Sequence, residues 1–407
     1  MESFVTQTLK LRPREDKRLK GGHVWIYSNE IDTAQTALKG FEPGEEAIVV
    51  NDAGRPLGRA LVNPHALICA RLVSRDADVG LDASLLTERL RRAAEVRARA
   101  YAGQDCFRLV YGEGDGLSGM VVDRFGGVFV VQLTTAGMEA RKDLVVDALR
   151  REFEPSSVVF KHDAPVREVE GLERYVEVIG DPVEAPVPLV ENGVPFLAPV
   201  ASGQKTGWFF DHRENRARLA PFCSEARVLD AFSYVGGWGL QTLAFGAREM
   251  LAVDGSAPAL EVLEANAAHQ GVSDRVRTMK GDAFEALGEL ADAHERFDVV
   301  VIDPPALVKR RKDLRAGQRA YERLAVLGMR LVADGGLLAF GSCSLHFDRA
   351  MLRDALRSAA RNTERTARIL GLHGAGPDHP VHPAIPETDY LKAALVQVHA
   401  AGRGGAL

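Results

Sequence analysis

The sequence predicts an α/β fold in which a doubly wound, mostly parallel sheet forms the C-terminal half and two smaller domains precede it. The chain has 407 residues, 46% of them hydrophobic, which is more than one ordinary core accommodates. From about residue 191 onward, short apolar runs alternate with helical stretches, a pattern typical of parallel sheets. The earlier residues lack this alternation. We therefore expect a β domain over 1–75, an α+β domain over 76–190 and the α/β domain over 191–407.

The first domain is expected to be mostly β structure. Short apolar runs at 24–27, 47–50 and 67–70 are separated by turn signals such as Pro43-Gly44. Residues 81–104 then form one continuous helical pattern, rich in Leu, Ala, Arg and Glu. The sequence thus predicts a small β module with a helix leading out of it.

The middle domain should contain a β-hairpin, because apolar runs at 120–125 and 128–133 flank Gly126-Gly127. A helix is expected over 137–152, and a linker or edge strand at Pro182, Pro186 and Pro188. This domain also holds a GxGxxG pattern at Gly114, Gly116 and Gly119. A dinucleotide site needs a strand before those glycines and a helix after them. Since a hairpin follows instead, we interpret the pattern as a turn.

Five strands are expected in the C-terminal domain, and their carboxyl ends should carry the chemistry. They are predicted at 227–232, 250–253, 276–280, 297–302 and 336–341. In open α/β sheets, ligands bind in the crevice outside the carboxyl ends of the strands. The residues just after these strands are therefore the candidate site residues.

Three acidic residues at successive strand ends predict an adenosine cofactor. Asp230 precedes a glycine-rich turn, Asp254 ends the next strand in the position that binds ribose hydroxyls, and Asp282 could hold the adenine amino group. No phosphate-binding loop accompanies them, which favours S-adenosyl-L-methionine over NAD. The expected cofactor-binding set from this region is Asp230, Phe232, Gly236, Gly237, Asp254, Ser256, Asp282 and Asp303.

Asp303 and Cys343 are the candidate catalytic residues. Asp303 begins an Asp-Pro-Pro run whose prolines remove backbone donors and fix the chain, and Cys343 follows the next strand within Ser-Cys-Ser. Cytosine C5 is too weak a nucleophile to take a methyl group unaided, but a thiolate that adds at C6 makes C5 carbanion-like. A carboxyl group near N3 would stabilise the charge that accumulates in the ring. The pair therefore predicts cytosine-C5 methylation.

Composition limits the other possibilities. The net charge of −5 gives no global case for nucleic acid, so basic segments at 1–25 and 309–315 would have to supply it. The four cysteines lie far apart, which argues against zinc or any other metal site and against disulfides. No run approaches the roughly 18 consecutive apolar residues of a membrane helix, and no export signal is visible. We therefore expect a cytoplasmic protein without a membrane partner.

Two further motifs extend these observations to a resemblance over essentially the full length. Residues 17–27, Lys-Arg-Leu-Lys-Gly-Gly-His-Val-Trp-Ile-Tyr, and residues 203–215, Gly-Gln-Lys-Thr-Gly-Trp-Phe-Phe-Asp-His-Arg-Glu-Asn, are similar to runs in PUA-containing class I methyltransferases. The chain resembles the members of that family that form 5-methylcytosine in bacterial 23S ribosomal RNA. After the prolines it departs from them, with Ala306-Leu307 where relatives often have Lys-Phe.

The resemblance implies a class I, Rossmann-like methyltransferase domain at the C-terminus and an RNA-binding PUA domain over residues 1–75. It implies that Lys205, Asp211 and Arg213 line the cofactor or catalytic pocket and that Cys343 is the nucleophile. The implied substrate is 23S ribosomal RNA, and a homodimer is among the assemblies we consider. The expected RNA contacts are Lys17, Arg18, Lys20, Lys309, Arg310 and Arg311.

Three alternatives stay open on the sequence. Guanine-N7 methyltransferases of ribosomal RNA share the Asp-Pro-Pro strand and need no covalent nucleophile, in which case Cys343 is structural. A methyltransferase acting on a protein or a small molecule would use the N-terminal module for protein interaction. A non-catalytic RNA-binding assembly factor would retain only the cofactor fold.

Overall fold

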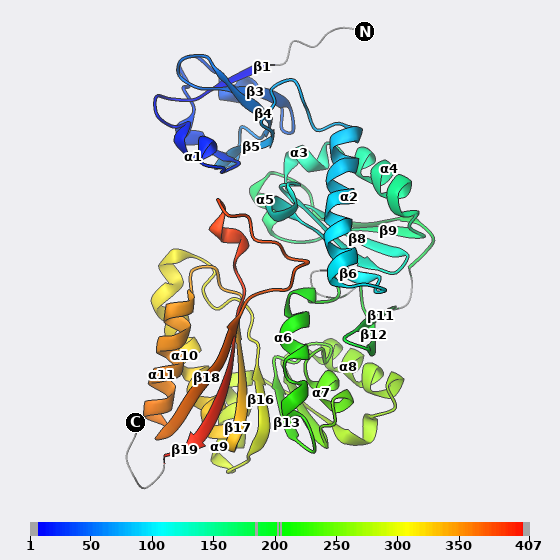
Figure 1. The fold of residues 1–407 in the computed structure, drawn as a ribbon, viewed down its shortest axis with the longest axis vertical. Coiled ribbons are helices and arrows are strands. Elements are labelled where there is room, and N and C mark those ends of the chain that lie inside the picture. The colour runs from blue at the N-terminus through cyan, green and yellow to red at the C-terminus, as the bar shows by residue number, and fades with distance from the viewer. Residues whose placement is uncertain (1–6, 184–185, 202, 204–205, 402–407) are drawn as a thin grey trace. The chain divides into compact units, whose positions relative to one another are not determined.

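The computed structural model describes residues 7–183, 186–201, 203 and 206–401. It divides the chain into two compact units, which are described separately. The first unit comprises 1–187, 200–208 and 377–388, and the second comprises 188–199, 209–376 and 389–407 (Figure 1). None of the helices in the described part of the chain combines the length and the apolar character that crossing a bilayer requires.

The first unit begins with a five-stranded sheet in the order β1-β3-β4-β5-β2. Alternate side chains of its strands form one apolar core that includes Leu9, Ile26 and Val49. The expected β module is confirmed. Its elements are β1 (Gln7–Lys10), α1 (Lys17–Lys20), β2 (Trp25–Tyr27), β3 (Glu46–Val50), β4 (Pro56–Val62) and β5 (Ile68–Ser74).

A second sheet of this unit has the order β10-β9-β8-β7-β6, antiparallel except where β8 pairs with β9. The predicted hairpin is β7 with β8, and the predicted helices are α2, which Asp82 caps, and α3 with α4. The elements are α2 (Ala83–Ala100), β6 (Cys106–Tyr111), β7 (Met120–Phe125), β8 (Val128–Leu133), α3 (Ala136–Glu139), α4 (Lys142–Phe153), β9 (Ser157–His162), α5 (Val166–Val169) and β10 (Tyr175–Gly180).

The GxGxxG pattern lies in the connection from β6 to β7. A short 3-10 helix at Gly112–Asp115 precedes Gly116, whose φ is 72°, and the chain then enters a strand. Gly119 also has a positive φ, and a Cβ there would lie 2.4 Å from the Thr135 side chain. The interpretation as a turn is confirmed, since no helix begins after these glycines.

Residues 377–388 belong to the first unit although they come late in the chain. The fully buried Arg97 forms a bidentate ion pair with Asp115 (2.6 and 2.7 Å) and also donates to the Asp378 carbonyl (2.6 Å). The Asp378 carboxylate accepts from Tyr101 Oη and from the Arg108 backbone. This buried polar network fixes the late segment against α2 and β6.

The second unit is built on a seven-stranded sheet in the order β15-β14-β13-β16-β17-β19-β18. The first five strands are parallel and β19 is antiparallel to both of its neighbours. They are β13 (Arg227–Ala231), β14 (Glu249–Asp254), β15 (Val276–Lys280), β16 (Phe297–Ile302), β17 (Val332–Ser342), β18 (Arg365–His373) and β19 (Lys392–Ala400). The strand order reverses between β13 and β16, which makes their carboxyl ends the switch point.

Helices cover both faces of this sheet, with α7 and α8 on one side and α10 and α11 on the other (Figure 1). A hairpin of β11 (Val187–Glu191) and β12 (Val194–Ala198) precedes them, so the strand expected near the prolines does form. The helices are α6 (Arg213–Ala217), α7 (Gly239–Ala244), α8 (Ala257–His269), α9 (Ala283–Asp292), α10 (Leu314–Leu331) and α11 (Arg349–Asn362).

The α/β prediction is confirmed, and all five predicted strands occur. The sequence analysis did not find β18 and β19, whose antiparallel pairing ends the alternation of strand and helix. These two strands matter to the site because β19 lies directly beside β17.

Candidate active site

Asp230 lies at the carboxyl end of β13 and is fully buried. Its Oδ2 accepts a hydrogen bond from the Gly239 backbone (2.8 Å), while Oδ1 has no partner among the described residues. Burial raises the pKa of this carboxyl to about 7, against the effect of the Gly239 hydrogen bond. A buried acceptor left without a donor is costly, so the site suits a ligand that donates to Asp230.

The glycine-rich turn after β13 is wound tightly. Phe232, Tyr234 and Gly236 all have positive φ angles, of 63°, 49° and 89°. A Cβ on Gly237 would lie 3.2 Å from Arg216 Nε, and one on Gly239 would lie 2.4 Å from Met250 Cε. The absence of side chains at these glycines therefore allows the turn to approach α6 and β14 closely.

The other two strand-end acids accept from their own loops. Asp254 accepts from the backbones of Tyr234 (2.9 Å) and Ser256 (2.8 Å), and the Ser256 side chain caps α8. Asp282 is exposed and caps α9 through one oxygen, Oδ1. Each acid thus fixes the loop in which it lies, and Asp282 keeps its second oxygen available to a ligand.

Asp303 follows β16, and its side chain is 20% exposed. Trp238 Nε1 donates to Oδ2 (3.0 Å), and His212 Nε2 lies 3.1 Å from Oδ1. Burial acts to raise the pKa of Asp303, but His212 and the two hydrogen bonds outweigh it and keep that pKa below its usual value. The carboxylate is therefore ionised and held in one orientation.

His212 itself is oriented by Asn215. The Asn215 side-chain nitrogen is 3.0 Å from the Gly374 carbonyl and 3.3 Å from His212 Nδ1. A carbonyl only accepts, so this atom is the amide nitrogen, and its second hydrogen faces Nδ1. The proton of a neutral His212 then resides on Nε2 and is donated to Asp303. The sequence analysis did not select His212 or Asn215, although both lie within the 203–215 motif.

Cys343 follows β17 on the same rim. Its Sγ lies 4.0 Å from the Pro304 carbonyl, and a Cβ on Gly341 would lie 2.6 Å from Asp303 Oδ1. The flanking Ser342 and Ser344 are buried and bond to the hydroxyl of Tyr321 (2.9 and 2.8 Å). Cys343 is partly exposed, whereas Cys69, Cys106 and Cys223 are buried. The thiol thus points away from the inward-facing serines.

The motif residues implied by the resemblance have different surroundings. Asp211 is buried and accepts from the hydroxyl of Tyr390, which lies just before β19. Arg213 is 1% exposed, and its Nε lies 3.7 Å from the buried Glu191, which also pairs with Arg216 (2.6 Å). Lys205 lies outside the described residues. No set of three or more metal-ligating side chains clusters within the described ranges.

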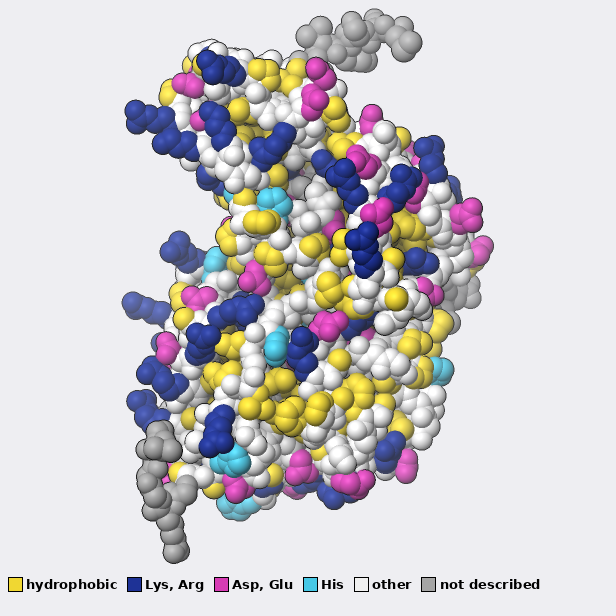
Figure 2. Space-filling model, in the orientation of Figure 1, with side chains coloured by type: hydrophobic (Ala, Val, Ile, Leu, Met, Phe, Trp, Pro, Cys, Tyr) yellow, Lys and Arg dark blue, Asp and Glu magenta, His cyan; other side chains and the backbone are white. Residues whose placement is uncertain are grey.

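The basic residues expected to contact RNA are mostly exposed. Arg18 makes a bidentate contact with Glu30, and Lys20 pairs with Asp16, while Lys17 is exposed. In the second unit, Lys309, Arg310 and Arg311 are exposed and precede α10. Figure 2 shows Lys and Arg side chains gathered over the first β module and along the α10–α11 edge.

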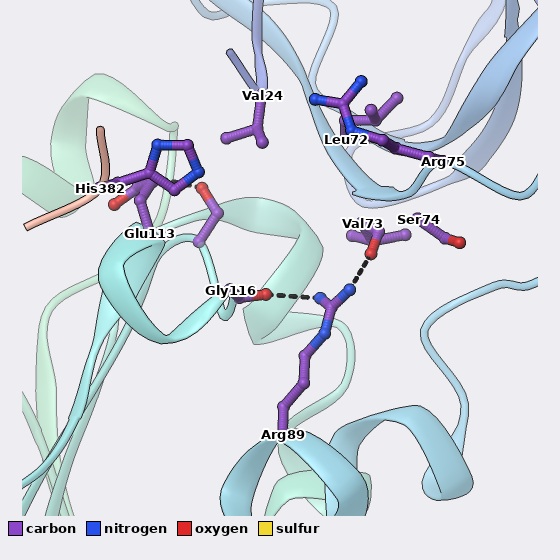
Figure 3. A pocket seen from close by; sticks show the side chains of 10 residues that line it. Val24, Leu72, Val73, Ser74, Arg75, Arg89, Glu113, Gly116 and His382 are labelled. Atoms are coloured by element: carbon purple, nitrogen blue, oxygen red, sulfur yellow. Dashed lines mark hydrogen bonds between the residues drawn. The ribbon is translucent and has the colours of Figure 1, made fainter. Parts of the chain in front are cut away.

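The described residues also form a cavity of about 140 Å³ in the first unit, between β5, α2 and the β6–β7 turn. Arg89 spans it, donating to the carbonyls of Val73 and Gly116 (Figure 3). Glu113 accepts from Trp25 Nε1 and Ser118 Oγ. These polar groups thus have hydrogen-bond partners within the protein. The cavity lies where the first sheet of this unit meets the second.

Comparison with known proteins gives a consistent picture. A family model of a PUA-like domain matches residues 9–75, and one named Conserved hypothetical protein 95 matches residues 210–316. Ribosomal RNA large subunit methyltransferase I of Alteromonas mediterranea is 33% identical over 95% of this chain and 98% of its own length. The protein of the same name from Aeromonas salmonicida is 34% identical over 94% of this chain and 97% of its own.

Two solved structures share the fold at low sequence identity. A putative SAM-dependent methyltransferase from Streptococcus mutans superposes with a TM-score of 0.80 at 18% identity, over 96% of this chain and 100% of that one. A putative methyltransferase complexed with SAH gives a TM-score of 0.82, with the same identity and coverage. The arrangement of β13 to β19 is therefore the Rossmann-like fold of solved methyltransferase structures.

Proposed function

The chain belongs to the ribosomal RNA large subunit methyltransferase I family, and from this membership we propose that it is an S-adenosyl-L-methionine-dependent enzyme that methylates C5 of a cytosine in 23S ribosomal RNA. The observation that carries the choice of C5 is the position of Cys343. This partly exposed thiol follows β17, on the rim where Asp303 follows the adjacent parallel strand β16. A guanine-N7 transfer would need no such thiol.

The residues at the ends of β13 to β16 fit the cofactor. The buried Oδ1 of Asp230 has no donor within the described ranges, which suits an ammonium or hydroxyl group of the ligand. Asp254 and Asp282 would accept from the ribose hydroxyls and the adenine amino group, with Phe232, Gly236, Gly237 and Ser256 shaping the loops between them. When bound, S-adenosyl-L-methionine supplies an electrophilic methyl group on its sulfonium.

The protein's part in the reaction begins with Cys343. Its thiolate adds to C6 of the cytosine, and the electrons of the C5–C6 double bond move to C5, which makes C5 nucleophilic enough for the methyl group that the bound cofactor would supply. A bound base would place the N3 lone pair against the ionised Asp303, and repulsion between the two favours uptake of a proton by the carboxylate. Protonated Asp303 then stabilises charge at N3. The C5 proton then passes to water, the electrons of the C5–H bond re-form the C5–C6 double bond, and the S–C6 bond breaks to release Cys343 as the thiolate.

RNA recognition would come from basic surfaces of both units. Lys17, Arg18 and Lys20 belong to the first β module, where Arg18 also stabilises the module through Glu30. Lys309, Arg310 and Arg311 follow the Asp-Pro-Pro run after three intervening residues and precede α10, where Arg315, Arg319 and Arg323 are exposed. Basic groups next to the catalytic rim would hold the phosphates around the target base. An rRNA substrate also implies a cytoplasmic enzyme. The homodimer stays a prediction, which sedimentation analysis would test.

The test is to incubate the protein and its Cys343→Ala variant with unmethylated large-subunit rRNA and methyl-labelled S-adenosyl-L-methionine. Labelled 5-methylcytidine that disappears in the variant supports the proposal. Labelled 7-methylguanosine, or an active variant, would instead favour the guanine alternative and a structural Cys343. Cofactor binding without transfer to any RNA would favour the assembly factor, and transfer only to proteins or small molecules would favour the remaining alternative.

A further inference from the structure

Lys392 is a buried lysine to which the mechanism above gives no task. It is the first residue of β19, opposite Ser342 of β17 in the antiparallel register, and its relative exposure is 4%. Lysine is almost never this buried unless a partner compensates its charge. The neighbours of Lys392 should therefore show what compensates it.

The Lys392 ammonium binds two neutral backbone carbonyls, one directly after Cys343 in the chain and one just before β19. Nζ donates to the carbonyl of Ser344 (2.6 Å) and to that of Tyr390 (2.7 Å). Ser344 is the residue directly after Cys343. No Asp or Glu oxygen lies within 4.0 Å of Nζ in the part of the chain that the structure describes. Two carbonyls solvate the ammonium, but neither neutralises it.

Burial lowers the pKa of Lys392 to about 8. Among the neighbouring groups, a negatively charged Cys343 thiolate opposes this lowering most strongly. By contrast, the buried Lys161 in the first unit forms an ion pair with Asp163 (2.5 Å). The titratable or charged groups around Lys392 and Cys343 are Tyr321, Asp348, Arg349 and Asp389, with the Asp303–His212 pair beyond Pro304.

We propose that Lys392 is the positioning residue of Cys343, its buried ammonium serving as the counter-ion that favours the thiolate in the resting enzyme. The proposal rests on the proposed function in taking Cys343 as the nucleophile. In the resting step, the S–H bond breaks, the proton leaves to water and Lys392 stays protonated. When the S–C6 bond forms, the negative charge moves into the ring and the ammonium remains hydrogen-bonded to the two carbonyls.

The test measures the reactivity of Cys343 without RNA or cofactor. Full-length protein reacts with limiting iodoacetamide from pH 5.5 to 10, and the alkylated Cys343 peptide is quantified by mass spectrometry. The other cysteines are buried, so labelling should be confined to Cys343. Lys392→Met removes the charge, Lys392→Gln removes it but keeps N–H donors for the carbonyls, and Lys392→Arg retains the charge. Lys161→Met is the matched control, because it removes a buried lysine from the first unit.

We expect both neutral variants to need about one pH unit more for half-maximal alkylation, which is roughly a tenfold slower reaction at pH 7. Lys392→Arg and Lys161→Met should keep the native profile. A native profile in Lys392→Gln or Lys392→Met, with an unchanged thermal transition, would overturn the proposal. Because this assay involves no methyl transfer, its result is independent of whether Cys343→Ala abolishes activity, and the two proposals can fail separately.

Discussion

At the scale of single residues, burial and the hydrogen-bond donors around each carboxyl group determine its pKa at the carboxyl edge of the sheet. Asp230 and Asp303 are carboxyl groups at neighbouring strand ends, yet their pKa values shift in opposite directions. Asp230 is fully buried and has one backbone donor, whereas Asp303 has His212 and Trp238. In the proposed cofactor site, the ligand would supply for Asp230 the donors that two side chains supply for Asp303.

Cofactor binding should therefore strengthen with pH. The raised pKa of Asp230 means that the folded protein without ligand loses stability as pH rises from about 4 to about 7, by up to roughly 4 kcal/mol. A donor on the ligand favours the ionised form. We expect the affinity for S-adenosylhomocysteine, measured by calorimetry, to rise up to about tenfold from pH 6 to pH 8. Asp230→Asn should bind more weakly with no such dependence, and a wild-type affinity independent of pH would contradict this role.

His212 should set the protonation of Asp303. His212→Ala removes the donor 3.1 Å from Oδ1, so the pKa of Asp303 should rise and the basic limb of the kcat profile, which follows loss of the proton from Asp303, should move to higher pH. Because the carboxyl group also loses the contact that orients it, we expect an approximately tenfold loss of kcat/KM at pH 7. His212→Gln, which retains an N–H donor, should recover much of it. An unshifted profile in a folded His212→Ala would show that Trp238 alone maintains the carboxylate.

At the scale of elements, helix α10 determines where the loop after Asp303 lies. Gly317 is buried within this helix, and a Cβ there would lie 2.7 Å from the Leu307 carbonyl and 2.3 Å from Val308 Cγ2. The Val308 backbone in turn donates to Ser344 Oγ (3.0 Å). The close approach of α10 thus connects the loop of Asp303 with the serine next to Cys343.

Gly317→Ala should destabilise the protein by about 1–3 kcal/mol, because the overlap with a backbone carbonyl outweighs the better helix propensity of alanine. Denaturant unfolding measures this difference. Gly288→Ala in α9 is the matched control, since a Cβ at Gly288 meets nothing within 4 Å. The control should be neutral or stabilise by up to about 1 kcal/mol. Equal effects of the two substitutions would show that the loop containing Leu307 and Val308 can move to accommodate the added methyl group.

At the scale of the whole molecule, a net charge of −5 coexists with an RNA substrate because positive charge is concentrated locally. On α10, Arg315, Arg319 and Arg323 follow one another every four residues, about 6 Å apart along the helix axis. All three are exposed, and no ion pair to them occurs among the described residues. Local clustering of this kind makes RNA affinity depend on salt concentration, so the net charge of the chain does not indicate whether it binds RNA.

Replacing Arg319 and Arg323 together by alanine should weaken rRNA binding. The slope of log affinity against log salt should decrease in magnitude by about 1.5, since each lost phosphate contact contributes about 0.7–0.9. Filter binding at several salt concentrations measures it, and kcat at saturating RNA should be unchanged. The control is Arg357→Ala on α11, whose arginine is already paired with Asp354 (2.9 Å). An identical slope in the double variant would exclude this face of α10 from RNA binding.

The sequence alone predicts the α/β fold, the five parallel strands and the strand-end positions of Asp230, Asp303 and Cys343. These follow from local periodicity, and parallel strands bring their carboxyl ends to one edge whatever the details of packing. Only the tertiary structure placed His212 against Asp303, Tyr390 against Asp211 and Lys392 on the carbonyl of Ser344, the residue after Cys343. The two members of each pair lie between about 50 and 180 residues apart in the chain. Lys392 also lies on an antiparallel strand, which the alternation of strands and helices does not predict. Hydrogen bonds and charge pairs over such separations depend on how the elements pack, which local periodicity does not encode.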